Sequence, residues 1–468
     1  MMSNSHIVAY QNIPEPFLTF SPEDDSCIDI HPLKGLVKYG PYNQKIISKA
    51  FNKIRVATIG PIGTKKIILD LINRLKAWHF PKERKQYLID YPGFQQVFKK
   101  DIVISEDINI EISVDQEKEL LNSDKPHIKL SEILCSFISK LDRYKFDILF
   151  IYLPEKWKIA FENKLDNDFD LHDFIKSVCV GYFIPTQIIR ENALNYNCQC
   201  SVMWHLGIAI YSKITGVPWK LAQMPRDTAY IGMSYALRNQ IGKPNFITCC
   251  SQIFDSEGSG LEFVAYETNN FRFSRIDNPY LTREEIRKVM GRCLSVYQER
   301  NMGILPKKIV IHKSTEFKEE EISGCYDALK GCDNVELLQI QQNVSWKGIK
   351  IDAKNKIANY PCDRGIILQL DNSLLLWTQG NVLLPESGKN FYKEGRGIPE
   401  PLLLNRFAGH GSWYESANSI LGLSKMNWNS DSLYDKLPVT LEFAQKLART
   451  IKRMPNLEAR LYQYRFFM

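Results

Sequence analysis

The sequence contains no long hydrophobic run. None of its apolar segments approaches the roughly 18 residues that a membrane-spanning helix requires, and the longest, such as residues 148–153, have the length of buried strands. The first residues, MMSNSHIVAYQNIPEPF, also lack the basic and apolar regions of a secretory signal. We therefore expect neither membrane insertion nor export.

Paired cysteine patterns are missing as well. The eleven cysteines are odd in number and scattered, which argues against a disulfide framework and favours a reducing, cytoplasmic location. Cys198 and Cys200, and the adjacent Cys249 and Cys250, do not have the CxxC spacing of structural zinc sites. We expect buried free thiols at these positions.

The chain has little excess charge of either sign. Sixty Lys and Arg against 53 Asp and Glu give a net charge of +7, which permits a polyanionic partner without requiring one. Hydrophobic residues make up 44% of the 468 residues, enough to bury sizeable cores, so a wholly disordered chain is excluded. A chain of this length is expected to form about two to four domains.

Strands and helices alternate along the sequence. Apolar runs predict buried strands at 54–60, 147–153, 229–237 and 308–312. Helical periodicity of apolar residues predicts helices at 64–78, 131–141, 193–216, 283–299 and 439–453. Residues 245–254 and 261–268 are expected to pair with the strand at 229–237 as a meander. Residues 1–30 are polar and are interpreted as an N-terminal arm. This order indicates an α/β fold with a largely parallel sheet.

A glycine loop follows the first predicted strand. Residues 60–66 read GPIGTKK, whereas a Walker-type phosphate loop has four residues between its first glycine and the Gly-Lys pair. Here two residues separate the glycines, and Thr64 precedes Lys65. We interpret the segment as a strand-to-helix turn.

A set of basic and amide side chains is the main candidate for a binding site. His172 and Lys176 are four residues apart and share one face of a predicted helix. Gln187 follows a predicted turn at Pro185, and Lys213 lies on a later predicted helix. From composition alone, ordinary surface residues are the simpler explanation.

The segments around these residues resemble the Argonaute family. The resemblance covers most of residues 150–460 in the family's order, through FDLHDFIKS, PTQIIRE, MWHLGIAIYSKITGVPWKLA, DTAYIGMSYAL, KIVIHKSTEF, GRGIPEPLLLNRFAGHGSW, ILGLSKMNWNSDSLYDKLPVT and LEFAQKLA. The early segment HPLKGLVKYGPYN resembles the start of the short prokaryotic branch. The resemblance implies a Rossmann-like MID domain over residues 31–200, followed by a ribonuclease H-like PIWI domain over residues 201–468.

The resemblance gives the basic set a role. The family binds the 5′ phosphate of its guide with a Tyr, Lys, Gln, Lys set, which falls here on His172, Lys176, Gln187 and Lys213. Two ammonium groups neutralise the phosphate, the amide donates a hydrogen bond and the ring stacks on the first base. His172 replaces the commoner Tyr, which leaves the base preference open. In many prokaryotic relatives the C-terminal carboxylate, here that of Met468, helps to hold a Mg²⁺ beside this phosphate.

Three of the four positions of the family's slicer tetrad, which carry Asp or, at the last, Asp or His, have no good ligand for a hard metal ion in this sequence. These positions fall at Ser234, Ser314 and Gln445. Hydroxyl and amide groups cannot replace carboxylate charges around Mg²⁺, so we expect no slicing and no enzymatic activity of this chain. The nearest acid to Ser314 is Glu316, two residues on, so a small alignment slip would put a carboxylate there.

The length resembles that of the short branch, which has MID and PIWI domains only. In that branch a partner carries an APAZ region fused to an effector, usually a sirtuin-like or TIR domain that consumes NAD⁺ and sometimes a nuclease. Inactive members typically use guide RNA to find complementary single-stranded DNA. We expect a cytoplasmic sensor that activates such a partner in defence against plasmids or phage. An active ribonuclease H-like guided endonuclease and silencing by target occupancy alone are the alternatives.

Overall fold

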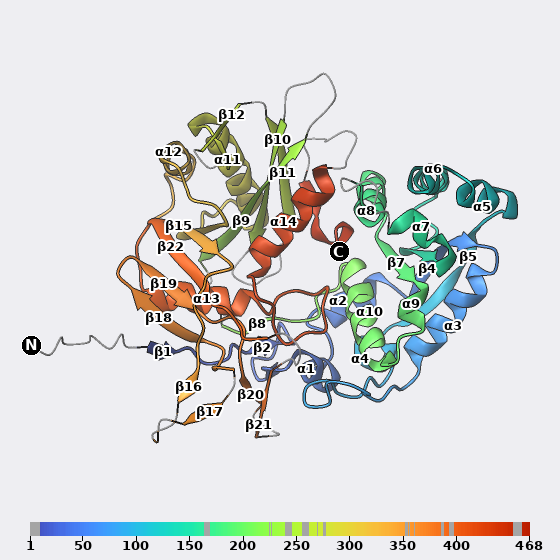
Figure 1. Cartoon of the computed structure of the whole chain (residues 1–468), viewed down its shortest axis with the longest axis horizontal. Coiled ribbons are helices and arrows are strands. Elements are labelled where there is room, and N and C mark those ends of the chain that lie inside the picture. Colours follow the sequence, from blue (N-terminus) through green and yellow to red (C-terminus); the bar gives the residue numbers. More distant parts are fainter. Residues whose placement is uncertain are drawn as a thin grey trace, which may run out of the picture.

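Two β-sheets organise the chain (Figure 1). The computed structural model describes residues 10–162, 169–223, 225, 227–238, 246–254, 262–268, 270–274, 278–351, 354, 356–359, 361–384, 388–392, 397–452 and 461–468. In this part of the chain no helix is both long and apolar enough to cross a membrane.

The first sheet is parallel and has four strands. Their order is β5 (Asp101–Ile112), β4 (Lys53–Pro61), β6 (Ile148–Leu153) and β7 (Thr186–Arg190). Every residue of β6 is buried, because alternate side chains enter cores on the two opposite faces of the sheet. Helices α3 (Thr64–Lys76) and α10 (Gln199–Lys213) contribute to one core, and α6 (Pro126–Ile138) and α8 (Leu171–Gly181) to the other.

The glycine loop between β4 and α3 is a turn, as the spacing predicts. Gly63 precedes α3 with a φ of 89°, a left-handed conformation that favours glycine. Its N–H group donates a hydrogen bond to Glu111 Oε1 at 2.8 Å. A carboxylate of the protein itself therefore lies at the start of this helix.

The second sheet has ten strands, in the order β1-β18-β19-β22-β15-β14-β9-β10-β11-β23. Strand β14 (Lys308–Lys313) runs parallel to both of its neighbours, β9 (Thr228–Arg238) and β15 (Asn334–Gln341). The other pairs are antiparallel, and include β10 (Phe246–Phe254) with β11 (Glu262–Thr268), as the predicted meander requires. The remaining strands are β18 (Ile366–Leu370), β19 (Ser373–Leu376), β22 (Leu402–Ala408) and β23 (Leu461–Gln463).

Helices cover both faces of this second sheet. Helices α11 (Arg283–Arg300) and α12 (Glu319–Ala328) pack on one face, and α13 (Trp413–Leu423) and α14 (Val439–Lys452) on the other. Helix α14 approaches β9 closely, since a Cβ atom at Gly232 would lie 2.0 Å from the Thr440 carbonyl oxygen. Only glycine fits at this point of the strand.

The remaining elements are short. They are β2 (Leu18–Thr19), β3 (Ile28–Asp29), α1 (Pro32–Tyr39), α2 (Gln44–Ala50), α4 (Phe94–Phe98), α5 (Val114–Leu121), α7 (Lys158–Phe161), α9 (Glu191–Leu194), β8 (Lys220–Leu221), β12 (Phe271–Phe273), β13 (Pro279–Leu281), β16 (Lys350–Ile351), β17 (Ile357–Asn359), β20 (Val382–Leu384), β21 (Lys389–Phe391) and the 3₁₀ turns Glu155–Trp157 and Tyr464–Phe466.

Three sequence expectations need correction. The helix expected over 193–216 is two helices, α9 and α10, separated by residues 195–198. Residues 102–105, whose sequence predicts a short strand, are only the start of β5, which extends to Ile112, and β22 is a strand that the sequence did not predict. The described cysteines are free, and Cys198 and Cys200 are buried, as predicted. Cys249 and Cys250 lie on β10, where side chains are outside the described part.

The segment interpreted as an arm is built into the fold from residue 10 onwards. Strand β1 (Tyr10–Asn12) pairs with β18, and β2 pairs with β8. Leu18 and Phe20 are buried, and the Glu15 carboxylate lies 2.9 Å from Arg364 Nε and 2.7 Å from Lys425 Nζ. Strand pairing, buried apolar side chains and ion pairs therefore hold residues 10–29 against the rest of the fold. The domain boundaries at residues 30 and 200 stay predictions.

Candidate nucleic-acid interface

The predicted basic and amide residues lie together where the two sheets meet. Helix α8 begins after Asp170, whose carboxylate caps it by accepting the Asp173 N–H at 3.0 Å. One turn of this helix separates His172 from Lys176. Gln187 lies on β7, and Lys213 is the last residue of α10.

Hydrogen bonds fix both lysines from the neighbouring strand. Lys213 Nζ donates to Gln187 Oε1, and Lys176 Nζ donates to the Thr186 carbonyl oxygen. Gln187 Nε2 donates to the Ile188 carbonyl oxygen at 3.1 Å. The sequence predicted that the Gln187 amide nitrogen would donate to a phosphate, but in this structure it donates to a backbone carbonyl oxygen. The Gln187 amide oxygen instead accepts from the Lys213 ammonium group and positions it.

Both lysines are 1% exposed and have shifted pKa values. Burial, with Lys446 nearby, lowers the pKa of Lys176 to about 7. Burial, Lys176 and Lys446 lower the pKa of Lys213 well below its usual range. Among the described residues, neither ammonium group forms an ion pair with a carboxylate. The site therefore favours an anion that would supply the missing charge.

Lys446 is a third cation that the sequence analysis missed. It lies on α14, which packs against α8, and is coupled electrostatically to both buried lysines and to His172. Burial lowers the pKa of Lys446 to about 8, against the opposing effect of Glu442. The sequence gives little indication that Lys446 belongs to a binding site, because it is a single lysine beside Gln445 on an amphipathic helix. Only the packing of α14 against α8 brings it to the site.

A cavity of about 570 Å³ adjoins these residues. His172 and Gln187 line it, together with His205 of α10 and Asp431. The His172 side chain is 40% exposed, and its Nδ1 lies 3.4 Å from Asp173 Oδ1. Burial and the neighbouring lysines lower the pKa of both His172 and His205. An exposed ring beside buried cations suits a phosphate with an attached base.

The end of the chain docks beside Lys213. Arg465 Nη1 donates to the Lys213 carbonyl oxygen at 3.4 Å, and the turn Tyr464–Phe466 contacts both α8 and α10 (Figure 1). Met468 is 3% exposed. The tail that carries the proposed terminal carboxylate is thus packed on the elements that carry the buried lysines.

The three degenerate slicer positions lie on β9, just after β14 and on α14, three neighbouring elements of the second sheet and its cover. Ser234 lies two residues beyond Gly232, on the side of β9 that meets α14. Ser314 follows β14, whose Lys313 is paired with Met233. Gln445 lies on α14 itself. Strands β9 and β14 are thus neighbours, and α14 packs against both. That these positions correspond to the slicer site stays a prediction.

Glu316, the acid considered for an alignment slip, is exposed and pairs with Lys318 Nζ at 2.9 Å. Within the described residues, the group of three potential metal ligands that lie within 4.8 Å of one another is Asp170, His172 and Asp173. That group is at the start of α8, where Asp170 already caps the helix.

Comparisons with known proteins agree on one family. No protein-family profile matches the chain. In sequence, it is 23% identical over 312 residues to "Protein argonaute" of Aquifex aeolicus (strain VF5), which is 66% of this chain and 39% of that protein. In structure, it resembles Clostridium butyricum Argonaute bound to a guide DNA and a 19-mer target DNA, with a TM-score of 0.69 and 17% identity. A structure of the A. aeolicus protein with externally bound siRNA gives a TM-score of 0.64 and 18% identity.

The structural matches cover nearly all of this chain, the sequence match covers 66% of it, and each covers only part of the relative. The two structural matches cover 100% and 98% of the chain, and 56% of each relative. The chain thus spans little more than half of the solved relatives and 39% of the curated one.

Proposed function

We propose that the chain, which is similar to Argonautes in sequence and in fold, binds the 5′ phosphate of a guide strand and pairs the guide with a target without cutting it. The observation that carries this proposal is the pair of buried ammonium groups of Lys176 and Lys213, with Lys446 near both. Among the described residues, no carboxylate forms an ion pair with Lys176 or Lys213. A phosphate dianion has the charge and the acceptor oxygens that these groups lack. Each charge-assisted contact would contribute about 1.5–3 kcal/mol.

The proposal of target binding without slicing rests on the residues Ser234, Ser314 and Gln445 at the positions where the resemblance predicts slicer carboxylates. Divalent cations in nucleases need carboxylate oxygens, and these three side chains offer hydroxyl and amide groups. The chain would therefore report a match between guide and target through a change in a partner. Guide RNA and target single-stranded DNA are the proposed strands.

The proposed partner is an APAZ-containing effector, as in short Argonautes that consist of MID and PIWI domains. A sensor without slicer carboxylates needs a catalytic output elsewhere, and binding of the target must favour the effector's active arrangement. A sirtuin-like or TIR effector that depletes NAD⁺ is preferred over a nuclease. The proposed setting is the cytoplasm, where such a complex would lead to abortive infection on entry of plasmid or phage DNA.

We also propose a Mg²⁺ beside the guide phosphate, held by the terminal carboxylate of Met468. The support is the docking of the tail on Lys213 through Arg465. A carboxylate oxygen and phosphate oxygens are the hard ligands that Mg²⁺ prefers. The cation would neutralise phosphate charge, while the lysines of this chain bind and orient the phosphate.

The test combines the chain with the effector encoded beside it. The complex is loaded with a guide RNA and given matched or scrambled single-stranded DNA, in Mg²⁺ and in Mn²⁺. We expect NAD⁺ loss with the matched DNA only, and intact target in every reaction. Equal effector activity with both DNAs would favour silencing by occupancy alone. Guide-directed cleavage would favour the endonuclease alternative.

A further inference from the structure

A separate cavity of about 440 Å³ lies between the first sheet and the C-terminal tail, and we call it the tail cavity. Its walls come mainly from the segments that precede β6 and β7 and from the tail beyond residue 461. Of the described residues, it shares none with the cavity beside His172 and Gln187. Its volume is typical of small-molecule sites, so it is large enough for a ligand of its own.

Exposed aromatic rings line part of the tail cavity. Tyr144 and Phe183 are 74% and 43% exposed. Phe183 meets the buried Phe466 edge to face, with 6.1 Å between the ring centroids. The φ of Phe183 is 57°, in the left-handed region that bulky residues rarely adopt. The rings of Tyr144 and Phe183 therefore offer accessible surface on which a flat aromatic ligand can stack.

Two arginines line the tail cavity beside these rings. Arg143 is exposed, and its guanidinium carbon lies 4.9 Å from the Tyr144 ring centroid and 5.8 Å from that of Phe183. Arg465 is partly buried, and burial lowers its pKa to about 10. Its Nη1 donates to the Lys213 carbonyl oxygen at 3.4 Å. Among the described residues, neither arginine forms an ion pair with a carboxylate.

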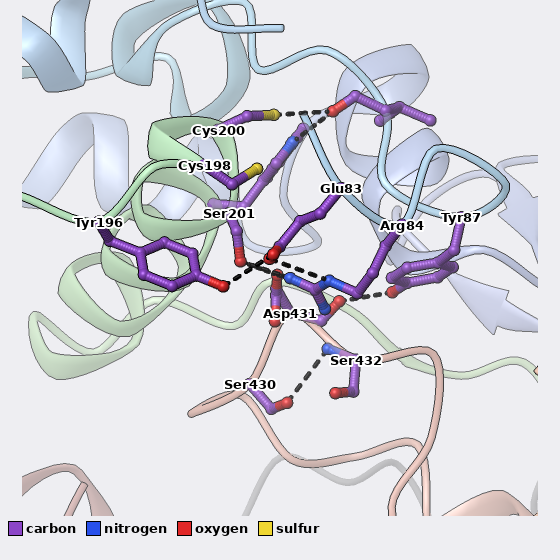
Figure 2. A network of polar contacts seen from close by, with 12 residues as sticks. Glu83, Arg84, Tyr87, Tyr196, Cys198, Cys200, Ser201, Ser430, Asp431 and Ser432 are labelled. Atoms are coloured by element: carbon purple, nitrogen blue, oxygen red, sulfur yellow. Dashed lines mark hydrogen bonds and ion pairs between the residues drawn. The ribbon is translucent and has the colours of Figure 1, made fainter. Parts of the chain in front are cut away.

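Charge balance distinguishes the tail cavity from another cavity that contains an arginine. In that cavity, of about 700 Å³, Arg84 lies 3.1 Å from Asp431 Oδ2 and 3.6 Å from Glu83 Oε1, so acids of the chain neutralise it (Figure 2). The acid that lines the tail cavity, Asp147, is instead paired with Arg55, whose Nη2 lies 3.0 Å from its Oδ1. The charges of both arginines of the tail cavity are therefore left for a ligand, which should be an anion.

We propose that the tail cavity binds a free nucleoside phosphate, with its base on the exposed rings and its phosphate groups on the two arginines. The planar guanidinium group binds phosphate oxygens through paired hydrogen bonds, which suits arginine better than lysine. A base of any kind has a flat face that can stack on an aromatic side chain. This inference goes beyond the proposed function, because it concerns a second ligand with lining residues of its own.

The test measures binding of ADP, adenosine and pyrophosphate to the full chain by isothermal titration calorimetry. ADP serves as the probe because stacking accepts every base. The wild type should bind ADP with a dissociation constant below about 100 µM. Adenosine and pyrophosphate should each bind at least about tenfold more weakly, because each lacks one of the two kinds of contact.

Three variants probe the two kinds of contact. Tyr144→Ala and Arg143→Gln change exposed side chains, so they should fold normally and each weaken ADP binding at least about fivefold. Arg465→Gln should weaken it at least about tenfold. The matched controls are Arg292→Gln on α11 and Tyr326→Ala on α12, which remove an exposed guanidinium group and an exposed ring and should leave ADP binding unchanged.

The variant Lys176→Ala/Lys213→Ala separates the tail cavity from the phosphate site, which a nucleotide can also enter. ADP binding should persist in this double variant. Its loss there, with full binding in Tyr144→Ala, would assign ADP to the phosphate site and overturn the proposal. Displacement of ADP by a 5′-hydroxyl oligonucleotide would also overturn it, because the cavity would then bind a strand.

The wild type alone gives two further outcomes. Absence of ADP binding would overturn the proposal, and so would equal affinities for ADP and pyrophosphate, since the rings would then have no role. The proposed function fails separately, if the wild type binds 5′-phosphate and 5′-hydroxyl guides equally, and that result leaves ADP binding to the tail cavity unaffected.

Discussion

Buried lysines without carboxylate partners are a liability for the free protein. Burial removes the hydration of the Lys176 and Lys213 ammonium groups and lowers the pKa of both. Repulsion by Lys446 adds to this effect at both residues, and repulsion by Lys176 adds to it at Lys213. Hydrogen bonds to Thr186 and Gln187 offset only part of this cost. Such an arrangement is typical of a site that is stabilised when its ligand binds.

Lys176→Met should therefore stabilise the free protein and weaken its function. The pKa of Lys176 is about 7 in the folded protein and about 10.4 when unfolded, so the unfolded chain binds more protons between these pH values. Stability of the free protein accordingly rises with pH over this window. In Lys176→Met that rise should shrink, and the free energy of unfolding at pH 7 should increase by about 1–3 kcal/mol.

Urea denaturation at pH 7 and pH 10 measures both effects. A variant with the wild-type pH dependence, or one less stable at pH 7, would show that the Lys176 charge is well tolerated in the free protein.

At the scale of elements, the sequence predicted those with strong local patterns. The strands now seen as β4, β6, β9 and β14 are continuous apolar runs, and α11 and α14 have clear periodicity, so their existence follows from local burial alone. Strand β22 was missed because LLLNRFA alternates only weakly and becomes a strand through pairing with β15 and β19. The break between α9 and α10 carries no proline or glycine and was equally invisible.

The site residues likewise divide into those that the sequence indicates and those that only tertiary packing brings into place. The resemblance, which is spread over many segments, predicted His172, Lys176, Gln187 and Lys213, whereas Lys446 could be found only from tertiary packing. Lys446 stands in no motif and reaches the site because α14 packs against α8.

The N-terminal segment offers a test of element docking. Glu15 is 13% exposed and lies between the fully buried side chains of Arg364 and Lys425. These two cations outweigh the effect of burial and lower the pKa of Glu15. Glu15→Gln should leave two buried charges uncompensated and cost about 3–5 kcal/mol of unfolding free energy.

Glu23→Gln is the control in the same segment, because its pair with Lys45 is exposed and should contribute less than 1 kcal/mol. Equal denaturation midpoints for the two variants would show that residues 10–30 form a loosely attached arm after all.

At the scale of the whole molecule, one core joins the two sheets. The same hydrophobic cluster includes Ile54 and Val56 of the first sheet and Tyr230 and Leu338 of the second. The lysine site lies at this junction, since α8 packs against α14 and both α8 and α10 contact the C-terminal turn (Figure 1). Binding of a phosphate at the junction would therefore act on both halves of the chain at once, which a sensor requires.

The most direct test of the account is the affinity for guides that differ only in the 5′ group. Dissociation constants are measured for 5′-phosphate and 5′-hydroxyl guides, with Mg²⁺ and with EDTA, for the wild type, Lys176→Ala/Lys213→Ala and the surface control Lys330→Ala. The wild type and the control should prefer the phosphate by at least a hundredfold, more so with Mg²⁺, and the double variant should lose most of this preference. Equal losses of affinity for both guides in the double variant would contradict a 5′-phosphate site at these lysines.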